Sequence, residues 1–225
     1  MLRTVFFDLD GTLTDSCPGI LAGMAHALTV FGRPTRPAEV PTAVIGPPLY
    51  DSFRSIYGMS DADAKAAVAA YRDYYGREGI FDNRVYPGIL PMLARLSSSG
   101  LRLYIATGKP HAYAARIAEH FGLLPYLSGV YGAEFDGTRG DKADLLAYAL
   151  RKEELDPCEA AMVGDRFYDV RGALGTGLLP LGVLWGYGSE EELSSVGAAY
   201  LARTPDALAE HLISLAKSRA FSVGI

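Results

Sequence analysis

Cysteine is scarce in this chain: Cys17 and Cys158 are the only two among 225 residues. Two cysteines cannot supply a disulfide framework or the ligand spacing of a zinc site. Both fit a reducing compartment, where an unpaired cysteine behaves as a small hydrophobic side chain. We therefore expect neither a disulfide-stapled secreted domain nor a zinc protein.

An excess of basic residues is also lacking. The formal net charge is −5, and acidic and basic residues are mixed along the chain. Nucleic-acid phosphates bind basic surfaces, so we expect no nucleic acid as the main partner. A small phosphorylated metabolite is compatible with this balance, because one or two lysines suffice to bind it.

Long apolar runs are missing as well. No stretch approaches the ~20 apolar residues that span a bilayer, and a strand-like run begins by Thr4, which leaves no room for a signal peptide. Hydrophobic residues make up 49% and charged residues 21% of the chain, which is typical of a globular protein. We expect a cytoplasmic protein without membrane contacts.

What the sequence does contain is a series of short apolar runs separated by helical patterns. The clear runs are residues 4–10, 101–107, 160–165 and 180–186, and a weaker one is 128–133. Nearly continuous hydrophobicity predicts strands that are buried on both faces, as in a parallel sheet. Alternation with helices from about residue 84 onward predicts a doubly wound, Rossmann-like α/β core with a mostly parallel sheet.

Polar residues mark the starts of several predicted helices. Thr204 is a predicted N-cap with proline at the next position, and Ser189 with Glu192 has the spacing of a capping box. Asp141 is a possible N-cap for a helix that opens with Lys142. A lysine in the first helical turn opposes the helix dipole, and such local conflicts are expected where function requires them.

Residues 16–82 break the alternation of strands and helices. They contain helix-like stretches on both sides of a proline-rich segment at 33–49, and no convincing strand. We predict a small all-helical cap domain inserted after the first strand. Residues 1–15 and 83–225 would then form the α/β core.

Residues that carry chemistry follow the predicted strands. In an open α/β sheet, ligands bind beyond the carboxyl ends of the strands. The residues expected there are Asp8, Asp10, Thr107, Gly108, Lys109, Asp165 and Asp169, together with Lys142. Four converging carboxylates repel one another, and a hard divalent cation with oxygen ligands such as Mg²⁺ relieves that repulsion. Asp169 is also a candidate N-cap for the helix that follows.

Two other phosphate- or metal-binding patterns do not match. A calcium loop that starts at Asp8 needs a carboxylate or amide at its fifth position and glycine at its sixth. Those positions hold Thr12 and Leu13. No G-x-x-x-x-G-K-[ST] phosphate loop is present either.

Four segments, "DLDGTLTDS", "ATGKP", "GDK" and "VGDRFYDV", together resemble the signature motifs of the haloacid dehalogenase (HAD) superfamily. Within it, the chain looks like the phosphoglycolate-phosphatase-like enzymes with a helical cap. The resemblance covers essentially the whole chain. It implies a Mg²⁺-dependent phosphatase that acts on a small phosphomonoester through an aspartyl-phosphate.

The resemblance also implies a role for each matching residue. Asp8 would be the nucleophile and Asp10 the acid and base. Thr107, with Gly108, and Lys142 would bind the phosphoryl oxygens. The proposed metal ligands are Asp8, Asp10 through its backbone carbonyl, Asp165 and Asp169.

Several alternatives stay open at this point. A nucleotidase or a pyrophosphatase, which are also hydrolases, would use the same residues. So would an isomerase, namely a phosphomutase of the β-phosphoglucomutase type. A binding protein with a residual fold is the third class of protein to consider. Gly46 and Pro47 resemble a cap loop that touches substrate, but a rigid turn explains them equally well. Lys109 either lines the site or lies in a solvated loop.

Overall fold

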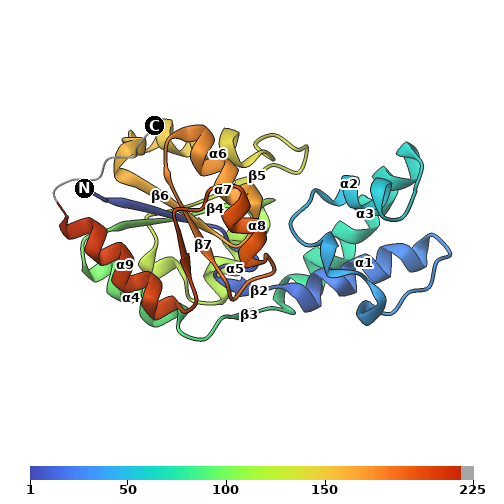
Figure 1. Cartoon of the computed structure of the whole chain (residues 1–225). Coiled ribbons are helices and arrows are strands. Elements are labelled where there is room, and N and C mark those ends of the chain that lie inside the picture. Colours follow the sequence, from blue (N-terminus) through green and yellow to red (C-terminus); the bar gives the residue numbers. More distant parts are fainter. Residues whose placement is uncertain (219–225) are drawn as a thin grey trace. The chain divides into compact units, whose positions relative to one another are not determined.

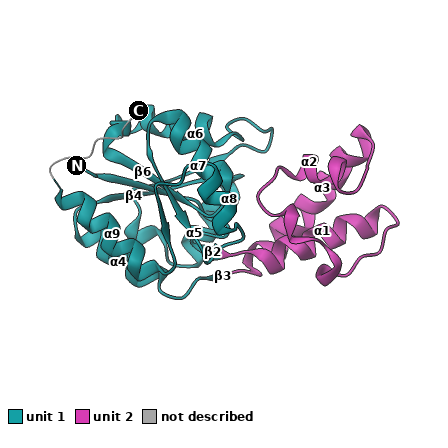
Figure 2. Ribbon diagram, viewed as in Figure 1, with its two compact units in different colours: residues 1–14, 85–225 teal, residues 15–84 magenta. Residues whose placement is uncertain are grey.

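The computed structural model describes residues 1–218, which form two compact units (Figure 2). The first unit comprises residues 1–14 and 85–225, of which 219–225 lie outside the described part. The second comprises residues 15–84. The chain therefore leaves the first unit after Thr14 and returns to it at Val85, seventy residues later.

A six-stranded sheet forms the centre of the first unit, with the strand order β5-β4-β1-β6-β7-β8. All of its pairings are parallel. The strands are β1 (Thr4–Phe7), β4 (Arg102–Pro110), β5 (Gly129–Ala133), β6 (Ala160–Gly164), β7 (Leu179–Val183) and β8 (Tyr200–Ala202). The predicted doubly wound α/β fold is confirmed, and all five predicted runs contain a strand.

The central strand β1 is buried because its four residues, TVFF, are apolar or small and are covered on both faces. Phe7 lies in register with Ile105 of β4 on one side and with Val163 of β6 on the other. The edge strand β8 was not predicted. It has only three residues, two of them half-buried, so it lacks the apolar run that identified the others.

Helices cover both faces of this sheet (Figure 1). Helix α4 packs beside α9, and α6 packs beside α7. The helices of this unit are α4 (Ile89–Ser98), α5 (His111–His120), α6 (Lys142–Lys152), α7 (Phe167–Thr176), α8 (Glu190–Ser195) and α9 (Pro205–Lys217). Phe6, Tyr104, Leu146 and Met162 belong to the buried cluster between the sheet and α6.

The order of the strands determines where a ligand can bind. From β1 the chain continues to β4 and then β5 on one side of the sheet, and then crosses to β6 on the other side of β1. The direction of winding thus reverses between β1 and β6. In open α/β sheets the ligand crevice lies at such a reversal, beyond the carboxyl ends of the strands.

The predicted helix starts are partly confirmed. Thr204 and Asp141 accept hydrogen bonds from the first-turn N–H groups of α9 and α6, as expected for N-caps. Ser189 caps α8 through the N–H of Glu192, but the Glu192 carboxylate accepts from Phe167 N instead of completing a capping box. Asp169 is not an N-cap: it lies inside the first turn of α7, which begins after Arg166.

The second unit is helical. It contains α1 (Cys17–Val30), α2 (Leu49–Ser55) and α3 (Asp61–Arg77), with 3-10 turns at Pro37–Glu39, Thr42–Val44 and Gly79–Phe81. Helices α1 and α3 pack directly on each other, and the ring of His26 in α1 stacks on that of Tyr74 in α3. The short strands β2 (Thr14–Asp15) and β3 (Arg84–Val85) pair where the chain passes between the units.

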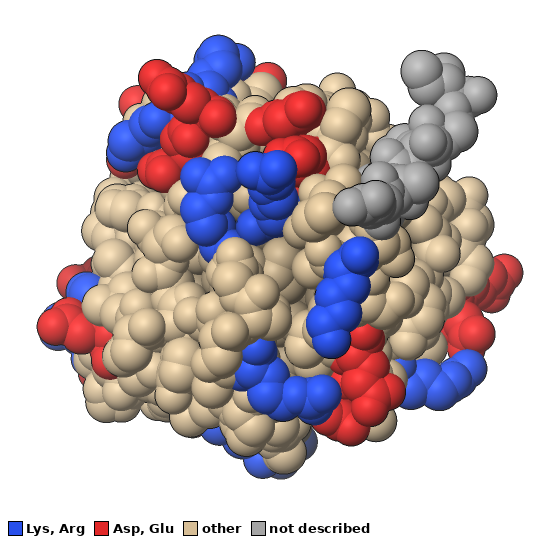
Figure 3. Space-filling view, turned by 90° about the vertical axis from the view of Figure 1, so that its left-hand side faces the viewer, with Lys and Arg blue, Asp and Glu red and all other residues tan. Residues whose placement is uncertain are grey.

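Two further features concern the length of the apolar helices and the distribution of surface charge. Among residues 1–218, no helix is long and apolar enough to span a membrane. On the face drawn in Figure 3, lysine and arginine side chains lie beside aspartates and glutamates, so neither sign of charge dominates that face.

Candidate active site

Asp8 lies at the end of β1, where the strand order reverses. Its N–H donates to Val163 O at 2.8 Å, which continues the ladder between β1 and β6 by one residue. The chain then turns sharply at Gly11, which has a φ of +84°. Glycine adopts this left-handed conformation without the steric cost that a Cβ brings. The turn leaves Asp8 at the edge of the sheet.

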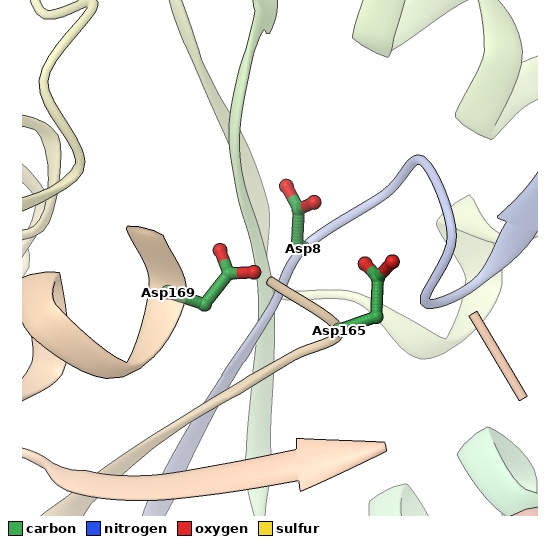
Figure 4. Close-up of side chains that lie close together, drawn as sticks. All are labelled: Asp8, Asp165 and Asp169. Atoms are coloured by element: carbon green, nitrogen blue, oxygen red, sulfur yellow. The ribbon is translucent and has the colours of Figure 1, made fainter. Parts of the chain in front are cut away.

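Three carboxylates from separate segments meet there (Figure 4). Oxygens of Asp8, Asp165 and Asp169 all lie within 4.8 Å of one another. Asp165 follows β6, and Asp169 lies one turn further on, in α7. Asp165 and Asp169 are 0% and 2% exposed. The structure thus brings together three of the four predicted metal-binding aspartates through their side chains.

Burial and mutual repulsion make these carboxylates unusual acids. Burial, with the nearby charges of Asp169 and Asp8, raises the pKa of Asp165 to about 8. Burial raises the pKa of Asp169 to about 6, although the ammonium of Lys142 opposes the shift. Such shifts concentrate at functional sites, where charges are held close together for a purpose.

Lys142 supplies positive charge to the cluster. Its Nζ lies 2.9 Å from Asp8 Oδ1 and 2.7 Å from Asp169 Oδ1, and it donates to Ala106 O at 2.9 Å. The two carboxylates raise the pKa of Lys142 against the opposing effect of burial, so the amine is charged. The conflict between a lysine and its helix dipole, noted in the sequence, is compensated by these two ion pairs.

Asp165 is held on both of its oxygens. Thr12 Oγ1 donates to Asp165 Oδ1 at 3.1 Å, and Tyr187 N donates to Asp165 Oδ2 at 2.8 Å. A Cβ on Gly186 would lie 2.4 Å from Asp165 Cβ, so the 185–188 loop can approach only because residue 186 is glycine. Trp185 Nε1 donates to Thr12 O at 3.0 Å and links the loop to the β1 turn.

The side chain of Asp10 lies outside the three-carboxylate group and has a different partner. Its Oδ2 lies 2.8 Å from Lys109 Nζ. Thr107 is buried at the end of the regular part of β4, and its Oγ1 accepts from Lys109 N at 3.3 Å. Gly108 is exposed, and a Cβ there would make only an ordinary contact of 4.0 Å with Gly140 O.

Gly46 and Pro47 belong to the second unit, in the segment that joins the Thr42–Val44 turn to α2. Gly46 has a φ of +108°, which favours glycine. This conformation agrees with the rigid turn that the sequence left open. Contact of these two residues with a substrate stays a prediction.

The charges of the site fit a divalent cation. With all four aspartates ionised, as metal binding requires, they face two lysines, which leaves two negative charges uncompensated in a largely buried place. Asp8, Asp165 and Asp169 offer carboxylate oxygens, a ligand type that Mg²⁺ prefers. Mg²⁺ is commonly held by one or two carboxylates with phosphate oxygens of the substrate. The residues present therefore fit Mg²⁺.

Some site residues were not found from the sequence. The hydroxyl of Thr12 and the N–H of Tyr187 act on Asp165 from segments 153 and 22 residues away. Glycines at 186 and 188 after the β7 run were the available signal, because paired glycines often mark close backbone approach.

Comparison with known proteins agrees with this geometry. A model of the haloacid dehalogenase-like hydrolase family matches residues 2–177, and a related HAD-hydrolase-like model matches 141–215. The chain is 40% identical to the tyrosine-protein kinase PtkA of Mycobacterium tuberculosis, over 93% of this chain and 72% of that protein. It is 40% identical to a 5'-nucleotidase of Pseudomonas aeruginosa, over 84% of this chain and 86% of that one.

Phosphatases are also among the similar proteins. A phosphoglycolate phosphatase of Vibrio parahaemolyticus is 26% identical over 96% of this chain and 97% of its own. The crystal structure of a predicted phosphatase from Clostridium acetobutylicum superposes with a TM-score of 0.90 at 38% identity, covering 95% of this chain and 99% of that one.

The chain belongs to the haloacid dehalogenase-like hydrolase family. The resemblance inferred from the four motifs is thereby confirmed. Relatives within the family include a 5'-nucleotidase, a phosphoglycolate phosphatase and a predicted phosphatase of known structure.

Proposed function

We propose that this protein is a Mg²⁺-dependent phosphatase that hydrolyses a small phosphomonoester through an aspartyl-phosphate on Asp8. The observation that carries the proposal is the convergence of Asp8, Asp165 and Asp169 within 4.8 Å, with Lys142 paired to Asp8 and Asp169. A buried nucleophile, oxygen ligands for a cation and a fixed ammonium are what phosphoryl transfer requires.

Each step then has a residue that performs it. An Asp8 oxygen forms a bond to phosphorus while the bond from phosphorus to the alcohol oxygen breaks. Asp10 gives its proton to that leaving oxygen. Asp10 then takes a proton from water as the water oxygen attacks phosphorus, and the bond to Asp8 breaks.

The remaining groups stabilise charge. Lys142, with Thr107, would bind the phosphoryl oxygens and offset the negative charge that develops on them. Asp8, Asp165, Asp169 and the Asp10 carbonyl would hold Mg²⁺. When bound, the ion supplies charge neutralisation and orients the phosphoryl group.

Phosphate release from a panel of phosphomonoesters tests this function. The panel should contain phosphoglycolate, nucleoside 5'-monophosphates and sugar phosphates, with pyrophosphate, an anhydride, tested beside them, each with Mg²⁺ and with excess EDTA. We expect free phosphate only with Mg²⁺, and no turnover by the folded Asp8→Asn variant. Full activity of that variant, or activity in EDTA, would contradict the proposal.

Nucleoside 5'-monophosphates deserve a place beside phosphoglycolate among the candidate substrates. The relative called a 5'-nucleotidase is 40% identical to this chain, whereas the phosphoglycolate phosphatase is 26% identical. A higher kcat/KM for nucleoside 5'-monophosphates than for phosphoglycolate would identify the nucleotides as the preferred substrates. An isomerised sugar phosphate in place of free phosphate would instead identify a phosphomutase.

Transfer of phosphate to tyrosine is a second candidate, because the relative called a tyrosine-protein kinase is 40% identical over 93% of this chain. Incubation with ATP and tyrosine-containing peptides would test it. Phosphotyrosine formation that requires Asp8 would favour the kinase, and phosphate release without phosphotyrosine would favour the phosphatase.

A further inference from the structure

Lys109 and Asp10 form an ion pair inside the site. Lys109 Nζ lies 2.8 Å from Asp10 Oδ2, and the two side chains are 6% and 17% exposed. The chain has five lysines, and burying one is costly unless its charge is compensated. Of these lysines, Lys109 and Lys142 form ion pairs with carboxylates of this site.

The backbone of β4 is shaped to bring Lys109 to Asp10. The pairing of β4 with β5 is regular as far as Thr107, which lies opposite Gly132, and it resumes at Pro110, which lies opposite Ala133. Gly108 and Lys109 are therefore extra residues on β4, a bulge of the kind that redirects a side chain next to an active site. Gly132 permits the bulge, because a Cβ there would lie 2.6 Å from Lys109 O.

The two oxygens of Asp10 have different surroundings. Oδ2 meets Lys109, while Oδ1 is buried and has no hydrogen-bond partner among the described residues. Lys109 fixes Oδ2, while Oδ1 has no partner in the described part of the chain that would compete for its proton. This arrangement suits a carboxyl group that donates a proton to a substrate oxygen. Lys142, the other lysine of the site, is occupied with Asp8 and Asp169 and does not replace Lys109.

We propose that Lys109 is a positioning residue that holds Asp10 by Oδ2, so that Oδ1 carries the proton to and from the reacting oxygens. The inference rests on the proposed function, since it requires Asp10 to be the acid and base. Lys109 acts here through Asp10 and not by binding the phosphoryl group.

Two substrates with different leaving groups distinguish a residue that positions Asp10 from one that binds the phosphoryl group. p-Nitrophenolate leaves without a proton, whereas the alkoxide of glycerol phosphate needs one. For Lys109→Met we expect kcat/KM for glycerol phosphate to fall about 10²-fold, within the range for a lost general acid, and that for p-nitrophenyl phosphate to fall less than about 10-fold. Asp10→Asn should likewise lose more kcat/KM on glycerol phosphate than on p-nitrophenyl phosphate. The variant that combines Lys109→Met with Asp10→Asn should be no slower than Asp10→Asn alone. Lys109→Arg should recover part of the loss.

If Lys109→Met lost kcat/KM equally on both substrates because KM rose, the proposal would be overturned and Lys109 would be a phosphate-binding residue. Unchanged activity would overturn it too. Lys217→Met, an exposed lysine at the end of α9, is the matched control and should be unaffected.

Crystal structures of wild type and Lys109→Met give a readout that does not depend on turnover. We expect the Asp10 side chain to leave its position in the variant while Asp8 and Asp165 stay. An unmoved Asp10 would overturn the proposal even if activity fell. Wild-type protein that releases phosphate from no phosphomonoester of the panel would reject the proposed function, and the position of Asp10 would still decide whether Lys109 holds it.

Discussion

The N–H of Tyr187 donates a hydrogen bond to Asp165 Oδ2 at 2.8 Å, and this bond ties the loop after β7 to the carboxylate after β6. Asp165 Oδ1 is held from the opposite segment by Thr12. A carboxylate fixed on both oxygens keeps its lone pairs aimed in one direction. Partners of this kind behind a metal ligand commonly contribute 10–100-fold in metal affinity.

Gly186→Ala should therefore weaken Mg²⁺ binding. The new methyl would lie 2.4 Å from Asp165 Cβ and 2.3 Å from Gly11 O, so the loop must move and the Tyr187 bond is lost. We expect about 10-fold weaker Mg²⁺ binding by calorimetry. Thr12→Val removes the other bond without adding bulk and should have an effect in the same direction. Wild-type affinity in both variants would show that the orientation of Asp165 does not depend on these partners.

Gly172 of α7 leaves room for the stem of Lys142. A Cβ at this position would lie 2.5 Å from Lys142 Cγ, so Gly172→Ala should displace the ammonium from Asp8 without removing it. We expect kcat to fall at least about 10-fold, since removal of one group that stabilises transition-state charge costs about 10²–10³-fold.

Gly175→Ala, on the same helix, is the matched control. Its Cβ would make an ordinary contact of 3.6 Å with Ala143 Cβ, and alanine is the better helix former. We expect unchanged kcat and equal or slightly higher stability in thermal unfolding. Equal losses of kcat in the two variants would mean that α7 itself, and not the position of Lys142, limits activity.

The sequence predicted the parts of the site that depend on strand ends, because parallel strands bring their carboxyl ends to one edge. Asp8 and Asp165 follow buried apolar runs, and the register of Phe7 with Val163 places them side by side. The partner of Asp10 could not be predicted in this way. The direction of Lys109 depends on a bulge between Thr107 and Pro110, and the hydrophobic pattern carries no trace of it.

The helical unit contains a close backbone approach that the sequence does not reveal. A Cβ on Gly19 of α1 would lie 2.0 Å from Gly79 O, a backbone atom that cannot rotate away. Gly19→Ala should lower the free energy of unfolding by about 1–3 kcal/mol, the usual cost of overpacking. Unfolding in urea measures this change in the free energy of unfolding. Ala66→Ser, on the exposed side of α3, should change stability by less than about 0.5 kcal/mol, and a similarly small effect of Gly19→Ala would contradict the close approach.

Stabilisation by Mg²⁺ should depend on pH, because Mg²⁺ and protons compete for the same carboxylates. The pKa of Asp165 is raised to about 8, well above that of an unfolded aspartate, so in the metal-free protein the folded state holds the extra proton. Stability contributed by that proton is present at low pH and is lost as pH rises through 8. If Mg²⁺ binds at Asp165 as proposed, it replaces the proton, and we expect its stabilising effect to increase over the same range.

Thermal unfolding with and without Mg²⁺ at pH 6, 7 and 8 measures this linkage. We expect the rise in Tm caused by Mg²⁺ to be largest at pH 8. Asp165→Asn removes both the proton site and a ligand, so this variant should show a small rise with little dependence on pH. An equal rise at pH 6 and pH 8 in the wild-type protein would mean that Mg²⁺ displaces no proton, and the carboxylate group at the end of β6 would then not be its binding site.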